Sequence, residues 1–108
     1  MRKGEIWFVE IPASNGREQE GLRPVVLVSE MEAQTAVVIP FTSNIQALKY
    51  PHTLEVAQTA KNGLKTTSVA LIFQLRAIDL KRLKNRIGVL EKETMVDIEK
   101  LIKSLLEL

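Results

Sequence analysis

Residues 22–44 read LRPVVLVSEMEAQTAVVIPFTSN, and this stretch decides the fold that the sequence predicts. It holds two runs rich in β-branched residues, at 24–29 and 34–40, separated by a short turn. Such a pattern is typical of two neighbouring β-strands. Antiparallel neighbours place the start of one strand beside the end of the next. The sequence therefore predicts that Arg23 and Thr42 lie close together at one edge of a sheet.

The rest of the chain predicts more short strands and one helix. Aromatic and β-branched residues at 5–11 predict a strand, and the polar stretch 13–22 predicts a loop. Further strands are expected at 53–56, at a sheet edge, and at 68–75 and 86–90, with an Asn-Gly turn in 61–65 and a short charged segment, DLKRLKNR, at 79–86. From residue 91 onward, apolar side chains recur at helical spacing: Met95, Ile98, Leu101, Ile102 and Leu105. The expected fold is mainly β, a small antiparallel barrel with one C-terminal α-helix packed on it.

Composition bounds the class of protein. A chain of 108 residues, 45% apolar and 26% charged, is long enough for one globular domain, expected at 1–108, and too short for two. The net charge of +2 permits an anionic partner without demanding one. There is no cysteine, which excludes disulfides and thiolate metal sites and fits a reducing compartment. No stretch resembles a signal peptide or a membrane span, so we expect a cytoplasmic protein with no membrane association.

The inventory of reactive side chains is short. His52 is the sole histidine, which excludes a two-histidine acid–base pair within the chain, and we expect it to be an ordinary surface or partly packed residue. No nucleotide-binding motif and no metal-ligand spacing occurs, so we expect neither a metal nor a cofactor. An enzyme built from this chain would use arginine, hydroxyls and carboxylates, or would take a reactive group from its substrate.

Arg23 is the first candidate for chemistry. Because Pro24 disfavours helical geometry in the residue before it, Arg23 is expected to be extended at the entrance of its strand. Its guanidinium is permanently charged and has a planar fork that suits phosphate oxygens. The polar side chains expected near it are Arg17, Glu18, Gln19, Thr42, Ser43 and Asn44. These residues together indicate a possible phosphate site.

A structural interpretation of the same residues is also open. Arg23 can pair with Glu5, Glu18 or Glu20 and so hold the loop in place. Thr42 and the serine after it can cap a single helical turn at 42–46. The basic run at 81–86 likewise has two interpretations, since it can attract a nucleic-acid backbone or an acidic protein tail, or simply face solvent. Spacing alone does not choose between these alternatives.

Four stretches resemble the MazF/PemK family of toxin endoribonucleases, also called mRNA interferases, from toxin–antitoxin systems. They are GEIWFVEI at 4–11, GREQEGLRPVVLVS at 16–29, VVIPFTSNI at 37–45 and SVALIFQLRAIDLKRL at 68–83. The second is similar to the family's G-x-E-Q-x-G-x-R-P-V-V signature, and the last to its S-V-x-L-x-x-Q-[IL]-R motif. The sequence departs from the family pattern at Glu20, Phe73 and Ala77. The resemblance covers nearly the whole chain.

The resemblance implies a fold, an activity and partners. The fold would be an SH3-like, PemK/CcdB-like small antiparallel barrel with a C-terminal helix, forming a homodimer. The activity would be metal-independent cleavage of single-stranded RNA, usually mRNA, to 2′,3′-cyclic phosphate and 5′-hydroxyl ends, held in check by a cognate antitoxin protein. The family's catalytic arginine and threonine fall on Arg23 and Thr42. The RNA-binding side chains would be Arg17, Glu18, Gln19, Ser43, Asn44 and Gln74.

Metal-free cleavage of this kind suits the short inventory, because RNA supplies its own nucleophile in the 2′-hydroxyl. Arg23 would stabilise the charge that grows on the phosphate, and Glu18 or a bound water would take the 2′ proton. Two alternatives from other classes remain: a non-catalytic SH3-like toxin or binding module that poisons gyrase, or an inactive family member. Arg23, Thr42 and Gln19 distinguish an RNA-cleaving toxin from a gyrase poison, because a gyrase poison has no need of them.

Overall fold

The structure is a computed structural model, and it describes residues 2–11, 21–31 and 33–108. Its elements in chain order are β1 (Glu5–Ile11), β2 (Gly21–Met31), β3 (Thr35–Thr42), the 3-10 turn η1 (Ile45–Lys49), β4 (Thr53–Val56), β5 (Ser68–Leu71), η2 (Ile72–Gln74), β6 (Arg76–Asp79), η3 (Leu80–Arg82), β7 (Leu83–Val89) and α1 (Lys92–Leu106). Within the described ranges, no helix is both long enough and apolar enough to cross a membrane.

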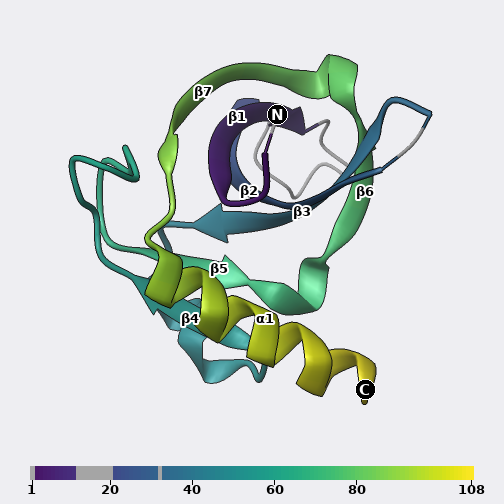
Figure 1. The fold of residues 1–108 in the computed structure, drawn as a ribbon. Helices are drawn as coiled ribbons and strands as arrows, with labels where there is room; N and C mark the ends of the chain where they lie inside the picture. Colours follow the sequence, from purple (N-terminus) through teal and green to yellow (C-terminus); the bar gives the residue numbers. More distant parts are fainter. Residues whose placement is uncertain (1, 12–20, 32) are drawn as a thin grey trace.

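The strands form one curved, antiparallel sheet. Its order is β4-β5-β3-β2-β1-β7, and β6 pairs with β3 beside that path. In Figure 1, β7 and β6 arch around from β1 back to β3, so the sheet is barrel-like without closing. β4 and β5 lie on one side of this ring, next to α1. The predicted fold class, mainly β with a C-terminal helix on a small antiparallel barrel, is confirmed, and so is the edge position of β4.

The hairpin of β2 and β3 forms as the sequence predicts. The two strands pair from Met31↔Thr35 to Val25↔Pro40, with a register shift between Leu27 and Ser29. Arg23 and Thr42 both lie two residues beyond the last of these pairs, at the same end of the hairpin. Beyond Pro40, β3 turns to pair with β5. This end of the hairpin is therefore where the site is built.

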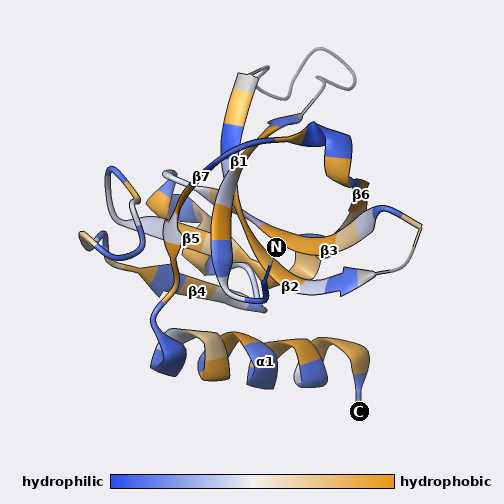
Figure 2. Ribbon diagram, turned by 45° about the horizontal axis from the view of Figure 1, so that its top comes forward, coloured by the Kyte–Doolittle hydropathy of each residue, from blue (hydrophilic) through white to orange (hydrophobic). Residues whose placement is uncertain are grey.

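The helix α1 packs its predicted apolar face on the sheet. Met95 and Ile98 are buried in the main core, and the other three predicted positions pack against that core: Leu101, Ile102 and Leu105. Figure 2 shows hydrophobic residues along β2, β3 and β5 at the centre of the molecule, while polar residues alternate along α1. A second apolar cluster joins β1, β2, β3 and β6 and includes Val25, Val38 and Ile78.

The structure differs from the prediction between residues 68 and 86. The single strand expected at 68–75 ends at Leu71, and η2 then redirects the chain into β6. The short charged segment expected at 79–86 contains the last residue of β6, all of η3 and the start of β7. A continuous apolar run shows that a segment is buried but does not show where it bends. β6 buries only Ile78 among its four residues, so its sequence lacks the usual pattern of a strand.

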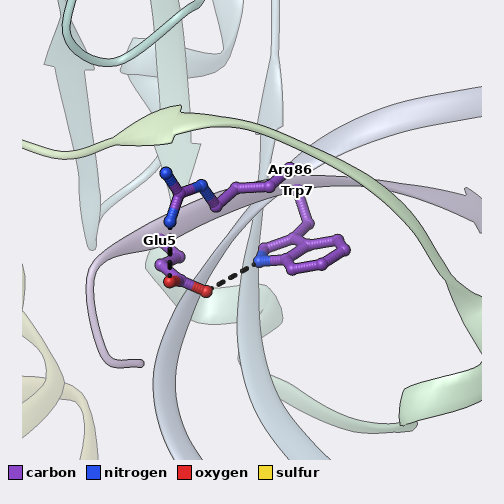
Figure 3. A network of polar contacts seen from close by, with 3 residues as sticks. All are labelled: Glu5, Trp7 and Arg86. Carbon is purple, nitrogen blue, oxygen red and sulfur yellow. Dashed lines mark hydrogen bonds and ion pairs between the residues drawn. The ribbon is translucent and has the colours of Figure 1, made fainter. Parts of the chain in front are cut away.

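A buried carboxylate joins β1 to β7. Figure 3 shows that Glu5 accepts a hydrogen bond from Trp7 Nε1 at 3.0 Å and pairs with Arg86 Nη1 at 3.1 Å. The proposed pairing of Glu5 with Arg23 is therefore wrong, because Glu5 is engaged by Arg86. Burial opposes ionisation of Glu5, but hydrogen bonds from Trp7, the backbone of Arg2 and Arg86 outweigh it and lower its pKa.

A second polar cluster fixes the turn between β4 and β5. Asn62 is fully buried, and its Oδ1 accepts backbone hydrogen bonds from Thr59 and Leu64, each at 3.0 Å. Its amide donates to the carbonyl of Ala57 at 2.9 Å and to the carboxylate of Glu91 at 3.3 Å. The hydroxyl of Thr59 also donates to Glu91, and this bond is the main reason that the pKa of Glu91 is lowered.

These two carboxylates predict how stability depends on pH. Glu5 and Glu91 both have a pKa below the ordinary value of 4.5 in the folded protein. Their stabilisation is therefore complete above about pH 4.5, the unfolded value, and is lost as the pH falls through the lower folded values. We expect the free energy of unfolding, measured with urea, to fall below pH 4.5. Glu5→Gln should reduce this fall, whereas Glu55→Gln, at an exposed position of β4, should not. An unchanged fall in Glu5→Gln would contradict the assignment.

Candidate functional site

Two adjoining pockets open at the end of the β2–β3 hairpin. One has a volume of about 240 Å³ and the other of about 210 Å³. Among the residues that the structure describes, only Arg23 and Thr42 line both pockets. The prediction that these two residues meet at one edge of the sheet is consistent with this arrangement. A ligand that occupies both pockets at once can therefore contact both residues.

The first pocket, of about 240 Å³, lies against the second apolar cluster, since Val25, Val38 and Ile78 line it. Its polar and aromatic lining comes from β1, β2, β3, η1, η2, β6 and η3 or the residues beside them: Glu10, Arg23, Thr42, Asn44, Tyr50, Phe73, Gln74, Arg76 and Arg82. The second pocket lies between β2 and the turn that Asn62 fixes. Its polar lining is Arg23, Thr42, Ser43, Lys65, Thr66 and Ser68.

Arg23 is half-buried at the entrance of β2, opposite Val9 of β1. Within the part of the chain that the structure describes, no ion pair joins it to a carboxylate. Its other proposed partners, Glu18 and Glu20, lie outside the described residues. Arg23 therefore lines both pockets, and neither Glu5 nor Glu10 pairs with it. This is a suitable place for an anionic group of a ligand.

Thr42 is held by the chain that follows it. Its Oγ1 accepts a hydrogen bond from the backbone N–H of Asn44 at 3.2 Å. The side chain of Asn44 in turn accepts from the N–H of Gln46 at 3.0 Å and caps η1. The cap is therefore Asn44, and the expected capping by Thr42 and Ser43 is wrong. Because its oxygen acts as acceptor toward Asn44, the hydroxyl of Thr42 keeps its own hydrogen for donation to a ligand.

The pockets carry an excess of positive charge. Arg76 and Arg82 line the first pocket together with Arg23, and Lys65 lines the second. The carboxylate of Glu10, which also lines the first pocket, pairs with Lys84 at 3.8 Å. A concave surface with several cations and few free anions favours a polyanion such as a nucleic-acid backbone.

The other predicted site residues divide into three groups. Gln74 and Asn44 line the first pocket, and Ser43 lines the second. Three lie outside the described residues, so the structure does not place them: Arg17, Glu18 and Gln19. Of the basic run at 81–86, Arg82 lines a pocket, whereas Lys84 and Arg86 pair with glutamates of β1.

His52 lies away from both pockets, as its expected role implies. It is half-buried, and its Nε2 lies 3.2 Å from the hydroxyl of Ser104 on α1. The expectation that it is a partly packed residue is confirmed.

No group of three or more His, Asp or Glu side chains that could hold a metal ion occurs in the described ranges.

The pocket residues that were not among the site candidates from the sequence include Tyr50, Lys65, Phe73 and Arg76. Arg76 stands two residues after Gln74 in the motif SVALIFQLR, so the motif was the signal that could have identified it. Tyr50 and Phe73 are far apart in the sequence and come together only through η1 and η2. No local pattern indicates that pairing.

The chain is similar to known proteins over nearly its whole length. Residues 2–106 match the family described as PemK-like, MazF-like toxin of type II toxin–antitoxin system. The chain is 30% identical to the endoribonuclease MazF of Staphylococcus epidermidis over 103 residues, which covers 92% of this chain and 85% of the relative. It is also 30% identical to the endoribonuclease EndoA of Bacillus subtilis over 107 residues, covering 95% and 91%.

Solved structures agree with the fold. MazF from Deinococcus radiodurans superposes with a TM-score of 0.78 at 19% identity, covering 98% of this chain and 96% of that one. An endoribonuclease in complex with its cognate antitoxin, from Mycobacterial species, superposes with a TM-score of 0.74 at 16% identity, covering 98% and 94%. These two likenesses show a shared architecture.

Proposed function

The chain belongs to the family of PemK-like and MazF-like toxins of type II toxin–antitoxin systems. We propose that it is an endoribonuclease that cleaves single-stranded RNA where its two pockets meet. Relatives at 30% identity over nearly the whole chain are endoribonucleases. One observation carries the proposal: Arg23 and Thr42 line both pockets. A phosphodiester has a nucleoside on each side, so two pockets that share a cationic junction suit an RNA strand whose phosphate lies at that junction.

The proposed chemistry uses a nucleophile from the substrate. The 2′-oxygen forms a bond to phosphorus while the bond from phosphorus to the 5′-oxygen breaks, which leaves a 2′,3′-cyclic phosphate and a 5′-hydroxyl. The 2′ proton passes to a base, either Glu18 or a bound water, and the leaving 5′-oxygen gains a proton. No metal is needed, because the enzyme's task is to hold the phosphate in line and to stabilise its growing charge.

Arg23 and Thr42 divide the work at the phosphate. The guanidinium fork of Arg23 can engage two non-bridging oxygens at once and stabilise their charge, and it donates toward the leaving 5′-oxygen as a second role. The hydroxyl of Thr42, oriented by the backbone of Asn44, donates to a phosphate oxygen. The pocket residues Ser43, Asn44 and Gln74 would position the strand. By the family resemblance so would Arg17, Glu18 and Gln19, which lie outside the described residues.

We also propose the partners that this activity implies. The protein would act as a homodimer, so that the groove continues from one protomer into its partner. A cognate antitoxin would cover the groove, as solved structures of similar fold contain a toxin together with its antitoxin. The positive pockets predict that the antitoxin segment lying in them is acidic.

Cleavage should survive removal of metal ions. We expect purified protein to cut a long unstructured RNA at the same initial rate with EDTA and with magnesium. Arg23→Ala, prepared in parallel, is the control for contaminating nucleases. Activity that disappears in EDTA and returns with magnesium or manganese would contradict the mechanism. No cleavage under either condition would favour the non-catalytic alternative.

A further inference from the structure

Two exposed aromatic rings meet at the mouth of the first pocket. Tyr50 follows η1 and Phe73 lies in η2, and both line that pocket. Their ring centroids are 5.8 Å apart, with the planes tilted by 56°. Half of Tyr50 and 40% of Phe73 are exposed to solvent. Lys49 Nζ lies 5.3 Å from the centre of the Tyr50 ring.

A backbone hydrogen bond holds the chain at each of the two rings. The N–H of Tyr50 donates to the carbonyl of Ala47 at 3.1 Å, and the N–H of Phe73 donates to the carbonyl of His52 at 3.3 Å. Neither ring belongs to a hydrophobic core of the described residues. The pair therefore presents aromatic surface to solvent that a ligand can cover.

The surroundings of the pair select the ligand. Arg23, Arg76 and Arg82 line the same pocket, so its occupant must supply negative charge. A second copy of this face would bring six arginines together across a two-fold axis, which is unfavourable. A nucleotide combines the two properties that the pocket requires, because its phosphate is anionic and its base has a flat apolar face. Aromatic side chains beside cationic ones are the usual surface on which single-stranded nucleic acid stacks.

We propose that Tyr50 and Phe73 form the stacking surface for the base of the nucleotide that lies in the first pocket, directly beside the scissile phosphate. This inference rests on the proposed function and specifies how that site holds its substrate. Phe73 and Tyr50 contact the base, while Arg23 and Thr42 contact the phosphate. The pair thus fixes which nucleotide of the strand reaches the junction.

The test uses a non-cleavable oligonucleotide with 2′-O-methyl groups and 2-aminopurine on one side or the other of the mapped cleavage site. Stacking lowers 2-aminopurine fluorescence, so we expect quenching by the wild-type protein on one side only. Phe73→Ala and Tyr50→Ala should each remove that quenching and weaken binding roughly tenfold or more. Phe73→Trp should retain both, and Phe73→Leu should not, because it keeps apolar area but lacks a ring. Ile45→Ala, at an exposed apolar position of η1, is the matched control and should bind like the wild type.

Three results would overturn the inference. They are unchanged binding and quenching in Phe73→Ala, wild-type behaviour of Phe73→Leu, or light scattering that shows Phe73→Ala converting a dimer into a monomer. The last result would mean that a second copy covers the rings. Each of these leaves cleavage by the wild-type protein intact. Failure of the proposed function is distinct, since the wild-type protein would then cut no RNA in EDTA.

Discussion

Arg23→Ala is expected to lower the rate of RNA cleavage by about two powers of ten or more, the usual loss when a preorganised charge stabiliser is removed. Arg23 lines both pockets, and no described carboxylate pairs with it, so its charge is available to the phosphate of the proposed substrate. Arg23→Lys should also lose most activity, because an ammonium has no planar fork to engage two oxygens. Initial cleavage rates and melting curves of the same protein samples measure both effects.

Thr42 and Ser43 supply the matched comparison for Arg23. Thr42→Ala should cost less than Arg23→Ala and clearly more than Ser43→Ala, since Thr42 lines both pockets and Ser43 only the second. If Arg23 only holds the loop in place, Arg23→Ala should instead lower the melting temperature and leave cleavage activity intact below that temperature. A stable and fully active Arg23→Ala protein would refute the catalytic role.

Gly63→Ala is expected to destabilise the fold by about 3 kcal/mol or more. Gly63 has a φ of +71°, and a Cβ there would lie 2.0 Å from the carbonyl oxygen of Ile87 on β7. The obstacle is backbone, so it cannot move aside as a flexible side chain would. The turn is also fixed from within by the buried Asn62.

Gly4→Ala separates the cost of the steric clash with β7 from the cost of the left-handed backbone at Gly63. Gly4 also has a positive φ, +93°, but nothing lies within 4 Å of a Cβ built on it. It should therefore show only the cost of left-handed geometry, about 1 kcal/mol. Urea unfolding of both variants measures the difference. Equal losses would show that the close approach to β7 is not what requires glycine at position 63.

The sequence predicts the parts of the fold that have a local pattern. The bounds of β1 and β4, the apolar face of α1 and the β2–β3 hairpin all follow from periodicity and composition. β6 was missed because it buries Ile78 alone, and η2 because the apolar run from Ser68 continues through the bend. Burial in this region is set by the ring as a whole, which a short window of sequence does not contain.

The site residues likewise divide into those that a local sequence pattern predicts and those that it does not. That Arg23 and Thr42 would be close followed from the antiparallel order of two strands, which is a local property. That Tyr50 would meet Phe73, or that Arg86 and not Arg23 would pair with Glu5, depends on how distant segments cross. Charge and residue type identify which side chains are able to act, and the tertiary arrangement determines which of them share a pocket.

The central claim is that the RNA strand supplies the nucleophile at the junction of Arg23 and Thr42. Its most direct test is cleavage, in EDTA, of an RNA in which one nucleotide at the mapped site carries 2′-deoxyribose, with the products analysed by mass spectrometry. We predict that this site stays intact while the all-ribose control is cut to a 2′,3′-cyclic phosphate and a 5′-hydroxyl. Cleavage at the deoxynucleotide, or products with a 5′-phosphate, would contradict the account.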